Sequence, residues 1–253
     1  MSTTPAGTSE APAVERGDGR LSALPSIVSG ERGRALFIAA YVVAALVTVA
    51  GKPLVDHVLE RLHEAGVETA VVNVHHFADQ MEAHLAGRTD PKVLIADERA
   101  ALLDSGGGIK NARALLGEDP ILVGNIDSLW IEGAEPALET LKKAWDPARM
   151  DILLLLVPRG QGIGFEGPRG FFMDEAGRLT HSAEPDPPTP YAYVGFAILK
   201  PQLLDDQPEG AFSILPLWWR LAAEGRLFGA VMDGFWMHVG DPEAREATEA
   251  RLR

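Results

Sequence analysis

Apolar runs of strand length alternate with amphipathic segments of helical length through the first two thirds of the chain. Residues 53–66 place leucine and valine on one helical face and end on a glycine, which predicts a helix. Residues 68–74 are almost uniformly apolar, which predicts a buried strand. The same patterns predict strands at residues 92–98, 120–126 and 150–158 and helices at residues 78–87, 109–117 and 135–145. This alternation predicts an α/β fold, with a Rossmann-like mixed, mostly parallel sheet and helices on both faces.

The last third of the chain is less regular. Its predicted elements are a hairpin at residues 170–180, a proline-rich loop at 184–190, a strand at 191–200, a helix at 213–225, a strand from 235 and a helix started by Asp241 and Pro242. A chain of 253 residues with 46% hydrophobic residues is large enough for one core. We therefore expect a single domain at residues 31–253, preceded by a tail at 1–30 that lacks hydrophobic periodicity.

Residues 35–50 run without a charge, which allows more than one interpretation. A membrane-spanning helix needs about 20 apolar residues, and the valines in this run favour a strand. We therefore expect a buried strand or core segment and no membrane contact. A membrane anchor is the competing interpretation.

Composition limits the function. The formal net charge is -13, which lacks the basic footprint of a nucleic-acid binder. There is no cysteine, so disulfides and thiol chemistry are excluded, and a reducing, cytoplasmic location is expected. Phosphorylated small molecules remain possible ligands, because backbone N–H groups, a few basic side chains and a metal can hold them.

Polar residues end the predicted strand at 120–126. Asn125 and Asp127 follow its apolar run, and ligands of such sheets bind beyond the carboxyl ends of the strands. A turn or helix-cap role for Asp127 is the competing explanation. His238 also follows a predicted strand, and a packing role competes there with a functional one.

Ser105, Gly106, Gly107 and Gly108 precede the helix predicted at 109–117. Glycines allow close approach of a ligand to the backbone, and a helix amino end offers free N–H groups. A flexible turn is the alternative. The histidines at 57, 63, 75, 76 and 84 do not match the spacing of a zinc site.

Six segments in order carry a family resemblance: VTVAGKPLVDHVLERL, VVNVHH, DERAALLDSGGGIKNARALLG, PILVGNIDSLW, YAYVGFAIL and FWMHVGDPEA. Together they resemble the sugar-1-phosphate nucleotidyltransferases, especially the N-acetylmuramate-1-phosphate uridylyltransferase and mannose-1-phosphate guanylyltransferase-like branch. The resemblance implies nucleotide-sugar and cell-wall precursor synthesis, in which a sugar 1-phosphate attacks the α-phosphorus of a nucleoside triphosphate and pyrophosphate leaves. Mg²⁺ is the implied cofactor, and catalysis of this kind rests mainly on positioning and electrostatics.

The resemblance also assigns residues. Its metal-binding aspartate falls on Asp127, and its second metal carboxylate falls on His238. Its nucleotide-base loop falls on Ser105 to Gly108. Asn125 and the strand residues Tyr193, Val194 and Gly195 fall in its sugar pocket.

The chain departs from the family near its start. Ungapped counting places the first glycine of the family's phosphate loop on Gly30 and its arginine, a candidate catalytic residue, on Arg34. Residues 35–44 then replace a polar loop with apolar residues, and Val43 and Ala44 replace a Pro-Lys pair. Genuine divergence and a frameshift-corrupted segment both explain this. A non-catalytic nucleotide- or sugar-binding relative is therefore the alternative function.

Overall fold

The computed structural model describes residues 34–39, 45–165, 170–181 and 189–253, and for 34–39 it describes the backbone. The helices are α1 (Leu54–Glu64), α2 (Ala78–Leu85), α3 (Asp104–Asn111), α4 (Arg113–Leu116), α5 (Ala137–Ala144), α6 (Leu215–Ala223) and α7 (Pro242–Leu252), with a 3₁₀ turn at Pro201–Leu204. The strands are β1 (Arg34–Ala39), β2 (Thr48–Val49), β3 (Lys52–Pro53), β4 (Thr69–Val74), β5 (Lys92–Asp97), β6 (Ile121–Asn125), β7 (Ser128–Glu132), β8 (Ile152–Pro158), β9 (Gly162–Ile163), β10 (Phe171–Met173), β11 (Leu179–His181), β12 (Tyr191–Leu199), β13 (Leu227–Val231) and β14 (Gly234–His238).

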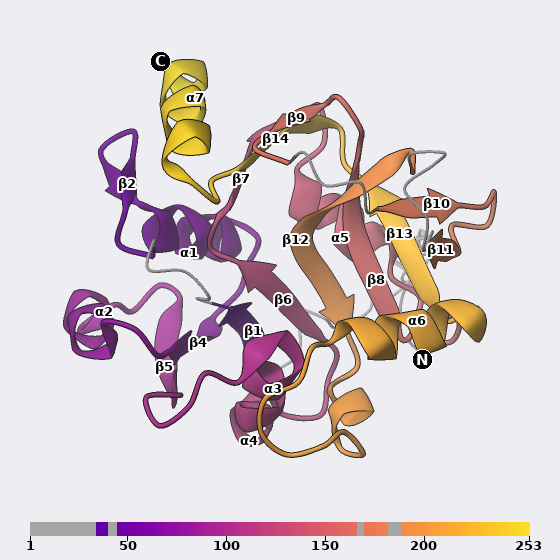
Figure 1. The fold of residues 1–253 in the computed structure, drawn as a ribbon, viewed down its shortest axis with the longest axis horizontal. Coiled ribbons are helices and arrows are strands. Elements are labelled where there is room, and N and C mark those ends of the chain that lie inside the picture. The colour runs from indigo at the N-terminus through magenta and orange to yellow at the C-terminus, as the bar shows by residue number, and fades with distance from the viewer. Residues whose placement is uncertain (1–33, 40–44, 166–169, 182–188) are drawn as a thin grey trace, which may run out of the picture.

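A nine-stranded mixed sheet forms the centre of the molecule (Figure 1). Its main path runs β11-β10-β12-β6-β1-β4-β5, and β8 pairs with both β12 and β13. The neighbours β6, β1, β4 and β5 are parallel, whereas β12 runs antiparallel to β6 and β8. The predicted fold class is confirmed, as is the hairpin, which forms β10 and β11.

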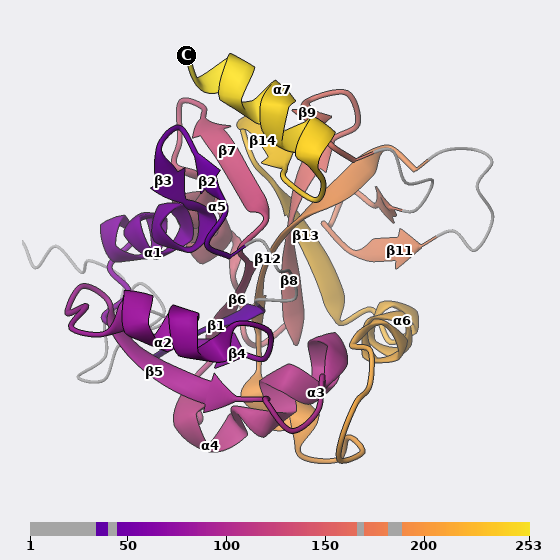
Figure 2. The ribbon, with the colours of Figure 1, turned by 60° about the vertical axis from the view of Figure 1, so that its left-hand side comes forward.

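Helices cover both faces of this sheet because its strands are apolar on both sides (Figure 2). In β4, Val72 belongs to the core shared with α1, α2 and α5, whereas the adjacent Val71 belongs to the core shared with α3, α4 and α6. Successive side chains of a strand point to opposite faces, so a uniformly apolar strand serves both cores. This explains why the strand patterns lacked polar alternation.

The apolar run near the start contains β1, which lies between β4 and β6. The strand predicted within residues 35–50 is therefore confirmed. Arg34, predicted to end a phosphate loop at residues 30–34, is the first residue of this strand, and its catalytic role stays a prediction. Gly30, like the predicted tail at 1–30 and the Val43-Ala44 pair, lies outside the described residues.

A second sheet, β7-β14-β9, stands beside the main one, and α7 packs near it (Figure 1). The helix α7 begins as predicted: Asp241 Oδ1 accepts a hydrogen bond from Ala244 N at 2.8 Å, which is an N-cap. Arg245 Nε donates to Thr48 O at 2.7 Å, which ties α7 to the β2–β3 hairpin. Among the described helices, none has the length and apolarity needed to cross a bilayer.

Candidate functional site

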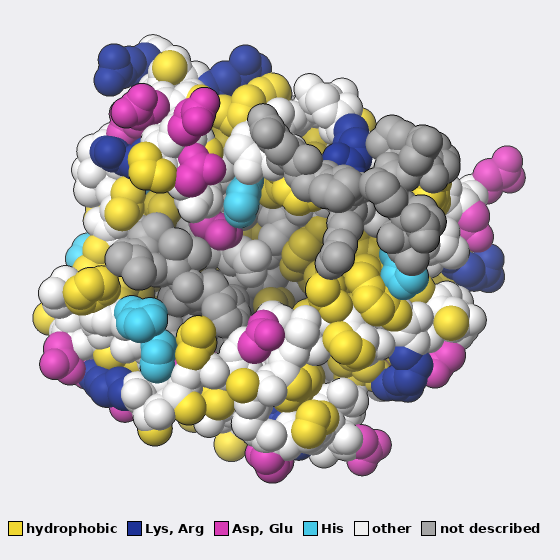
Figure 3. Space-filling model, viewed as in Figure 1, with side chains coloured by type: hydrophobic (Ala, Val, Ile, Leu, Met, Phe, Trp, Pro, Cys, Tyr) yellow, Lys and Arg dark blue, Asp and Glu magenta, His cyan; other side chains and the backbone are white. Residues whose placement is uncertain are grey.

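The turn between β6 and β7 holds Asp127 at the carboxyl edge of the parallel strands. β6 belongs to the main sheet, and β7 leaves it to pair antiparallel with β14, in a register that sets Ser128 opposite His238. Val239 N donates to Asp127 O at 2.7 Å, which closes the pairing beyond the strand ends. Asp127 and His238, predicted separately from the sequence, are thereby brought together. The surface is hollowed in the middle of this face, with acidic and histidine side chains at the edge of the hollow (Figure 3).

The imidazole of His238 is held at both nitrogens. Its Nδ1 lies 2.9 Å from Gly164 O, and its Nε2 lies 3.4 Å from Asp127 Oδ2. A carbonyl oxygen only accepts, so Nδ1 carries a proton and donates to Gly164. The pKa of His238 is raised above its ordinary value, first because its side chain interacts with the Asp127 carboxylate. The Gly164 carbonyl and the charge of Asp241 act in the same direction, and burial opposes them.

The Asp127 carboxylate is mostly enclosed but incompletely bonded. Its side chain is 14% exposed, and Oδ1 has no hydrogen-bond partner within the described part of the chain. A buried carboxylate oxygen without a partner costs free energy, so such a group calls for an explanation. A ligand or cation at this oxygen would supply one. Asp127 also lies in the turn between β6 and β7, so its position agrees with the structural explanation, a turn aspartate, as well as with a ligand-binding role.

Gly195 lets β12 approach the turn closely. It has φ +87° and lies where the pairing of β12 with β8 shifts register. A Cβ on Gly195 would lie 3.2 Å from the Cβ atoms of Asn125 and Ser128. A side chain there would be strained and crowded, which accounts for glycine in an otherwise bulky strand. Asn125 and Gly195, both predicted to border a sugar, are thus adjacent in space, and Asn125 lies two residues before Asp127.

The other two predicted sugar residues lie differently. Val194 is fully buried in the core, and its carbonyl accepts a hydrogen bond from Ser128 Oγ. Alternation along β12 turns the Val194 side chain inward, and a role of Val194 in sugar binding stays a prediction. Tyr193 packs edge-on against Trp218, with ring centroids 5.0 Å apart. Burial, and then the Asp127 charge, raise the pKa of Tyr193, so its phenol stays neutral.

The glycines at 106–108 are inside α3 rather than ahead of it. Gly106 N and Gly107 N donate to Phe212 O at 2.9 and 3.1 Å. A Cβ on Gly107 would lie 2.3 Å from Gly210 O, so the segment before α6 packs directly on this helix. Ser105 Oγ accepts from Ile214 N at 3.1 Å. The packing explains these residues without a ligand, and contact with a nucleotide base stays a prediction.

Sequence reasoning missed several polar residues near this edge. Trp236 Nε1 donates to Ser128 Oγ at 2.8 Å, which locks β14 to β7. Asn73 and Glu98, at the ends of β4 and β5, are each 2% exposed, and Asn73 Nδ2 donates to Glu98 Oε1 at 3.2 Å. Burial raises the pKa of Glu98. The asparagine inside the apolar run at 68–74 was the signal that could have revealed this pair.

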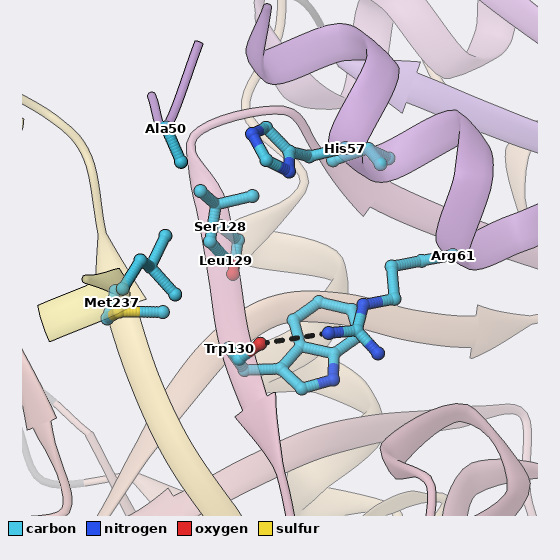
Figure 4. A pocket seen from close by; sticks show the side chains of 9 residues that line it. Ala50, His57, Arg61, Ser128, Leu129, Trp130 and Met237 are labelled. Carbon is cyan, nitrogen blue, oxygen red and sulfur yellow. Dashed lines mark hydrogen bonds between the residues drawn. The ribbon is translucent and has the colours of Figure 1, made fainter. Parts of the chain in front are cut away.

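A cavity of about 230 Å³ is lined by residues of α1, β7, β14 and α7 (Figure 4). Arg61 reaches into it, donates to Trp130 O at 3.2 Å and pairs with Glu132 at 2.8 Å. Because Glu132 already neutralises this guanidinium, the cavity lining has no uncompensated arginine charge to attract an anion. We assign no ligand to it.

Comparison with known proteins places this arrangement in a class. No model of a known protein family matches the sequence. HddC from Yersinia pseudotuberculosis, complexed with GMP-PN, has a similar fold, with a TM-score of 0.67 over 87% of this chain and 99% of that chain at 17% identity. A UDP-glucose pyrophosphorylase complexed with UDP-glucose has a TM-score of 0.68 over 86% of this chain and 97% of that one, at 17% identity. The fold is that of the nucleotide-diphospho-sugar transferases.

Sequence relatives narrow the class. The chain is 52% identical over 212 residues to an N-acetylmuramate alpha-1-phosphate uridylyltransferase from Caulobacter vibrioides, across 82% of this chain and 87% of that protein. An enzyme of the same name from Neisseria meningitidis is 30% identical over 201 residues, across 77% of this chain and 83% of that protein. A mannose-1-phosphate guanylyltransferase from Mycobacterium tuberculosis is 28% identical over 213 residues, which cover 78% of this chain and 55% of that protein. The chain belongs to the sugar-1-phosphate nucleotidyltransferase family, which confirms the predicted family and enzyme class.

Proposed function

We propose that this protein transfers a uridylyl group from UTP to N-acetylmuramate α-1-phosphate. The observation that carries the proposal is the 52% identity to an enzyme named for this reaction, over 82% of the chain. In the reaction a phosphate oxygen of the sugar 1-phosphate bonds to the α-phosphorus of UTP. The bond from that phosphorus to the pyrophosphate oxygen breaks, and pyrophosphate leaves. The proposal includes a cytoplasmic location, because the donor is a nucleoside triphosphate.

The residues at the carboxyl edge fit a divalent cation, which the sequence resemblance names as Mg²⁺. Asp127 supplies a carboxylate whose Oδ1 is free of hydrogen bonds within the described chain, and His238 Nε2 faces its other oxygen. A cation bound there would offset the charge that develops on the phosphates. Asp127 and His238 would hold it, and Asn125 with the Gly195 backbone would border the sugar. No acid–base group is required, since an in-line displacement needs mainly orientation and charge compensation.

A second candidate function, nucleotide or sugar binding without efficient turnover, is favoured by the segment after β1. Residues 35–50 contain no lysine or arginine, and only residues 40–44 connect the end of β1 to Ala45. Lys52, the next cation along the chain, is paired with Glu60. A triphosphate held against apolar side chains would lose hydration without gaining hydrogen bonds.

Pyrophosphate release separates the two functions. UTP with N-acetylmuramate 1-phosphate is expected to give the fastest release among pairs of nucleoside triphosphates and sugar 1-phosphates, including GTP with mannose 1-phosphate. Faster release from the guanosine pair would refute the proposed substrates. A version in which a polar G-x-G-x-R…P-K loop replaces residues 40–44 is the comparison for the second candidate. If the unmodified chain binds UTP by calorimetry yet turns over about 10²–10³ times more slowly than the repaired chain, it is a binding protein in its present form. Equal rates would eliminate that candidate.

A further inference from the structure

We infer that His238 makes the cation site at Asp127 selective for a first-row transition-metal ion over Mg²⁺. The inference rests on the proposed function, because that function is what calls for a cation at Asp127. It adds that the metal is bound by one nitrogen and one oxygen from the protein. Among the described residues no cluster of three or more His, Cys, Asp or Glu side chains forms a metal site. The remaining ligands would therefore be phosphate oxygens and water.

The orientation of the imidazole carries the inference. Nδ1 donates to Gly164 O at 2.9 Å, which fixes the ring and points Nε2 at Asp127. Ring nitrogens that bind metals commonly have their partner nitrogen held in this way by a backbone carbonyl. When the ring is neutral, Nε2 presents a lone pair to the carboxylate oxygen 3.4 Å away. Two acceptors facing each other are stabilised by a cation that both can bind.

A second histidine–carboxylate pair shows what distinguishes this one. His84 Nε2 lies 2.9 Å from Asp56 Oδ2, and the exposure of the two imidazoles is the same, 32%. However, Arg88 Nη2 lies 3.5 Å from Asp56 Oδ1, so that carboxylate already has a cation at its other oxygen. Asp127 Oδ1 has no partner in the described chain. Of these two histidine–carboxylate pairs, only His238 with Asp127 contains a carboxylate oxygen without a partner in the described chain.

Ligand chemistry sets the direction of the selectivity. Mg²⁺ prefers oxygen ligands and binds imidazole poorly. Affinity of a nitrogen- and oxygen-containing site rises from Mn²⁺ through Co²⁺ to Cu²⁺. An imidazole in place of a second carboxylate therefore weakens Mg²⁺ binding and strengthens binding of the later metals.

Metal competition on the full-length protein tests the inference without measuring turnover. The chelator-treated protein is titrated with Co²⁺, followed by visible absorption, and Mg²⁺ is then added to displace it. The excess of Mg²⁺ needed to displace Co²⁺ is expected to fall about tenfold or more in His238→Asp. His84→Gln is the matched control and should need the same excess as the unmodified protein.

A second measurement tests directly whether His238 binds the metal. It does not use the His238→Asp variant, so it remains informative if that variant folds poorly. Co²⁺ bound to Nε2 should shift the Nδ1–H proton resonance of His238 far outside the normal range, since the hydrogen bond to Gly164 slows its exchange. This signal should vanish in His238→Gln and persist in His84→Gln. The inference fails if Co²⁺ does not bind, if the displacing excess is equal in the unmodified protein and His238→Asp, or if the shifted signal survives in His238→Gln. Because no turnover is measured, a failure of the proposed reaction would appear separately, as absent pyrophosphate release with every metal.

Discussion

Replacing Gly195 with alanine is expected to destabilise the protein and to disturb the sugar side of the site. Gly195 has φ +87°, a conformation that residues with a Cβ adopt only at a cost. The new Cβ would also lie 3.2 Å from Asn125 Cβ and 3.3 Å from Asn125 Nδ2, and 3.2 Å from Ser128 Cβ. These contacts are tighter than ordinary packing, so Asn125 or Ser128 must move.

The expected magnitude combines three contributions. The left-handed conformation costs an alanine roughly 1–2 kcal/mol. Crowding against two neighbours adds about 1 kcal/mol, at the low end for overpacking because the overlap is slight. Alanine loses less backbone entropy on folding than glycine, which offsets about 0.4–1 kcal/mol. The net loss in the free energy of unfolding is therefore about 1–3 kcal/mol.

Gly87→Ala is a control that carries the strain without the crowding. Gly87 has φ +81°, and a Cβ there would meet no atom within 4 Å. Urea denaturation of both variants should show Gly195→Ala less stable than Gly87→Ala by about 1 kcal/mol. The KM for the sugar 1-phosphate should rise in Gly195→Ala alone, because Asn125 is displaced. Equal stability losses, with an unchanged KM, would refute the argument that close approach at Gly195 shapes the site.

Three further predictions concern other parts of the molecule. Asp127→Ala should lower metal-dependent pyrophosphate release by about 10²–10³ while the melting temperature stays near that of the unmodified protein; a retained rate would remove Asp127 from the site. Arg226, and then Lys200, lower the pKa of Asp151 from 3.8 to about 2, although burial opposes them. The ion pairs of Asp151 therefore stabilise the folded state above about pH 4, and this stabilisation is lost as pH falls through about 2. Asp151→Asn should therefore cost about 1–2 kcal/mol at pH 7, a value reduced for solvent screening, and nothing below pH 2; a loss independent of pH in urea denaturation would contradict this. Gly107→Ala should destabilise the fold by about 1–3 kcal/mol whether or not UTP binds, because its Cβ would overlap the Gly210 carbonyl; normal stability with weakened UTP binding by calorimetry would instead support a base contact.

The alternating strands and helices of the first two thirds of the chain could be predicted from the sequence, because the hydrophobic pattern that defines each element is local. The helix at 53–66 and the strand at 68–74 became α1 and β4 within a few residues. β7 was missed because only the Ile126-Asp127 turn separates it from β6, so one apolar stretch contains two strands that enter different sheets. Local hydrophobicity does not report which sheet a strand joins.

The candidate site was partly predictable for the same reason. Asp127 and His238 each follow an apolar strand, which is a local signal. Their approach depends on the antiparallel register of β7 and β14, which the spacing does not reveal. The inward orientation of Val194 and the position of Gly107 inside α3 also depend on tertiary packing, which the sequence pattern does not reveal.

The attachment of α7 to the β2–β3 hairpin has a consequence for the order in which the protein folds during synthesis. The parallel strands β1, β4, β5 and β6 lie early in the chain and can pair while the ribosome is still translating the rest. The contact that ties the β2–β3 hairpin to α7 needs Arg245, and His238 meets Asp127 only when β14 is available to pair with β7. A nascent chain stalled before residue 234 would therefore carry all nine strands of the main sheet, but it would lack both the contact between the hairpin and α7 and the approach of His238 to Asp127. In such a chain Leu129 would still lack its packing partners Met237 and Val239, which follow residue 234.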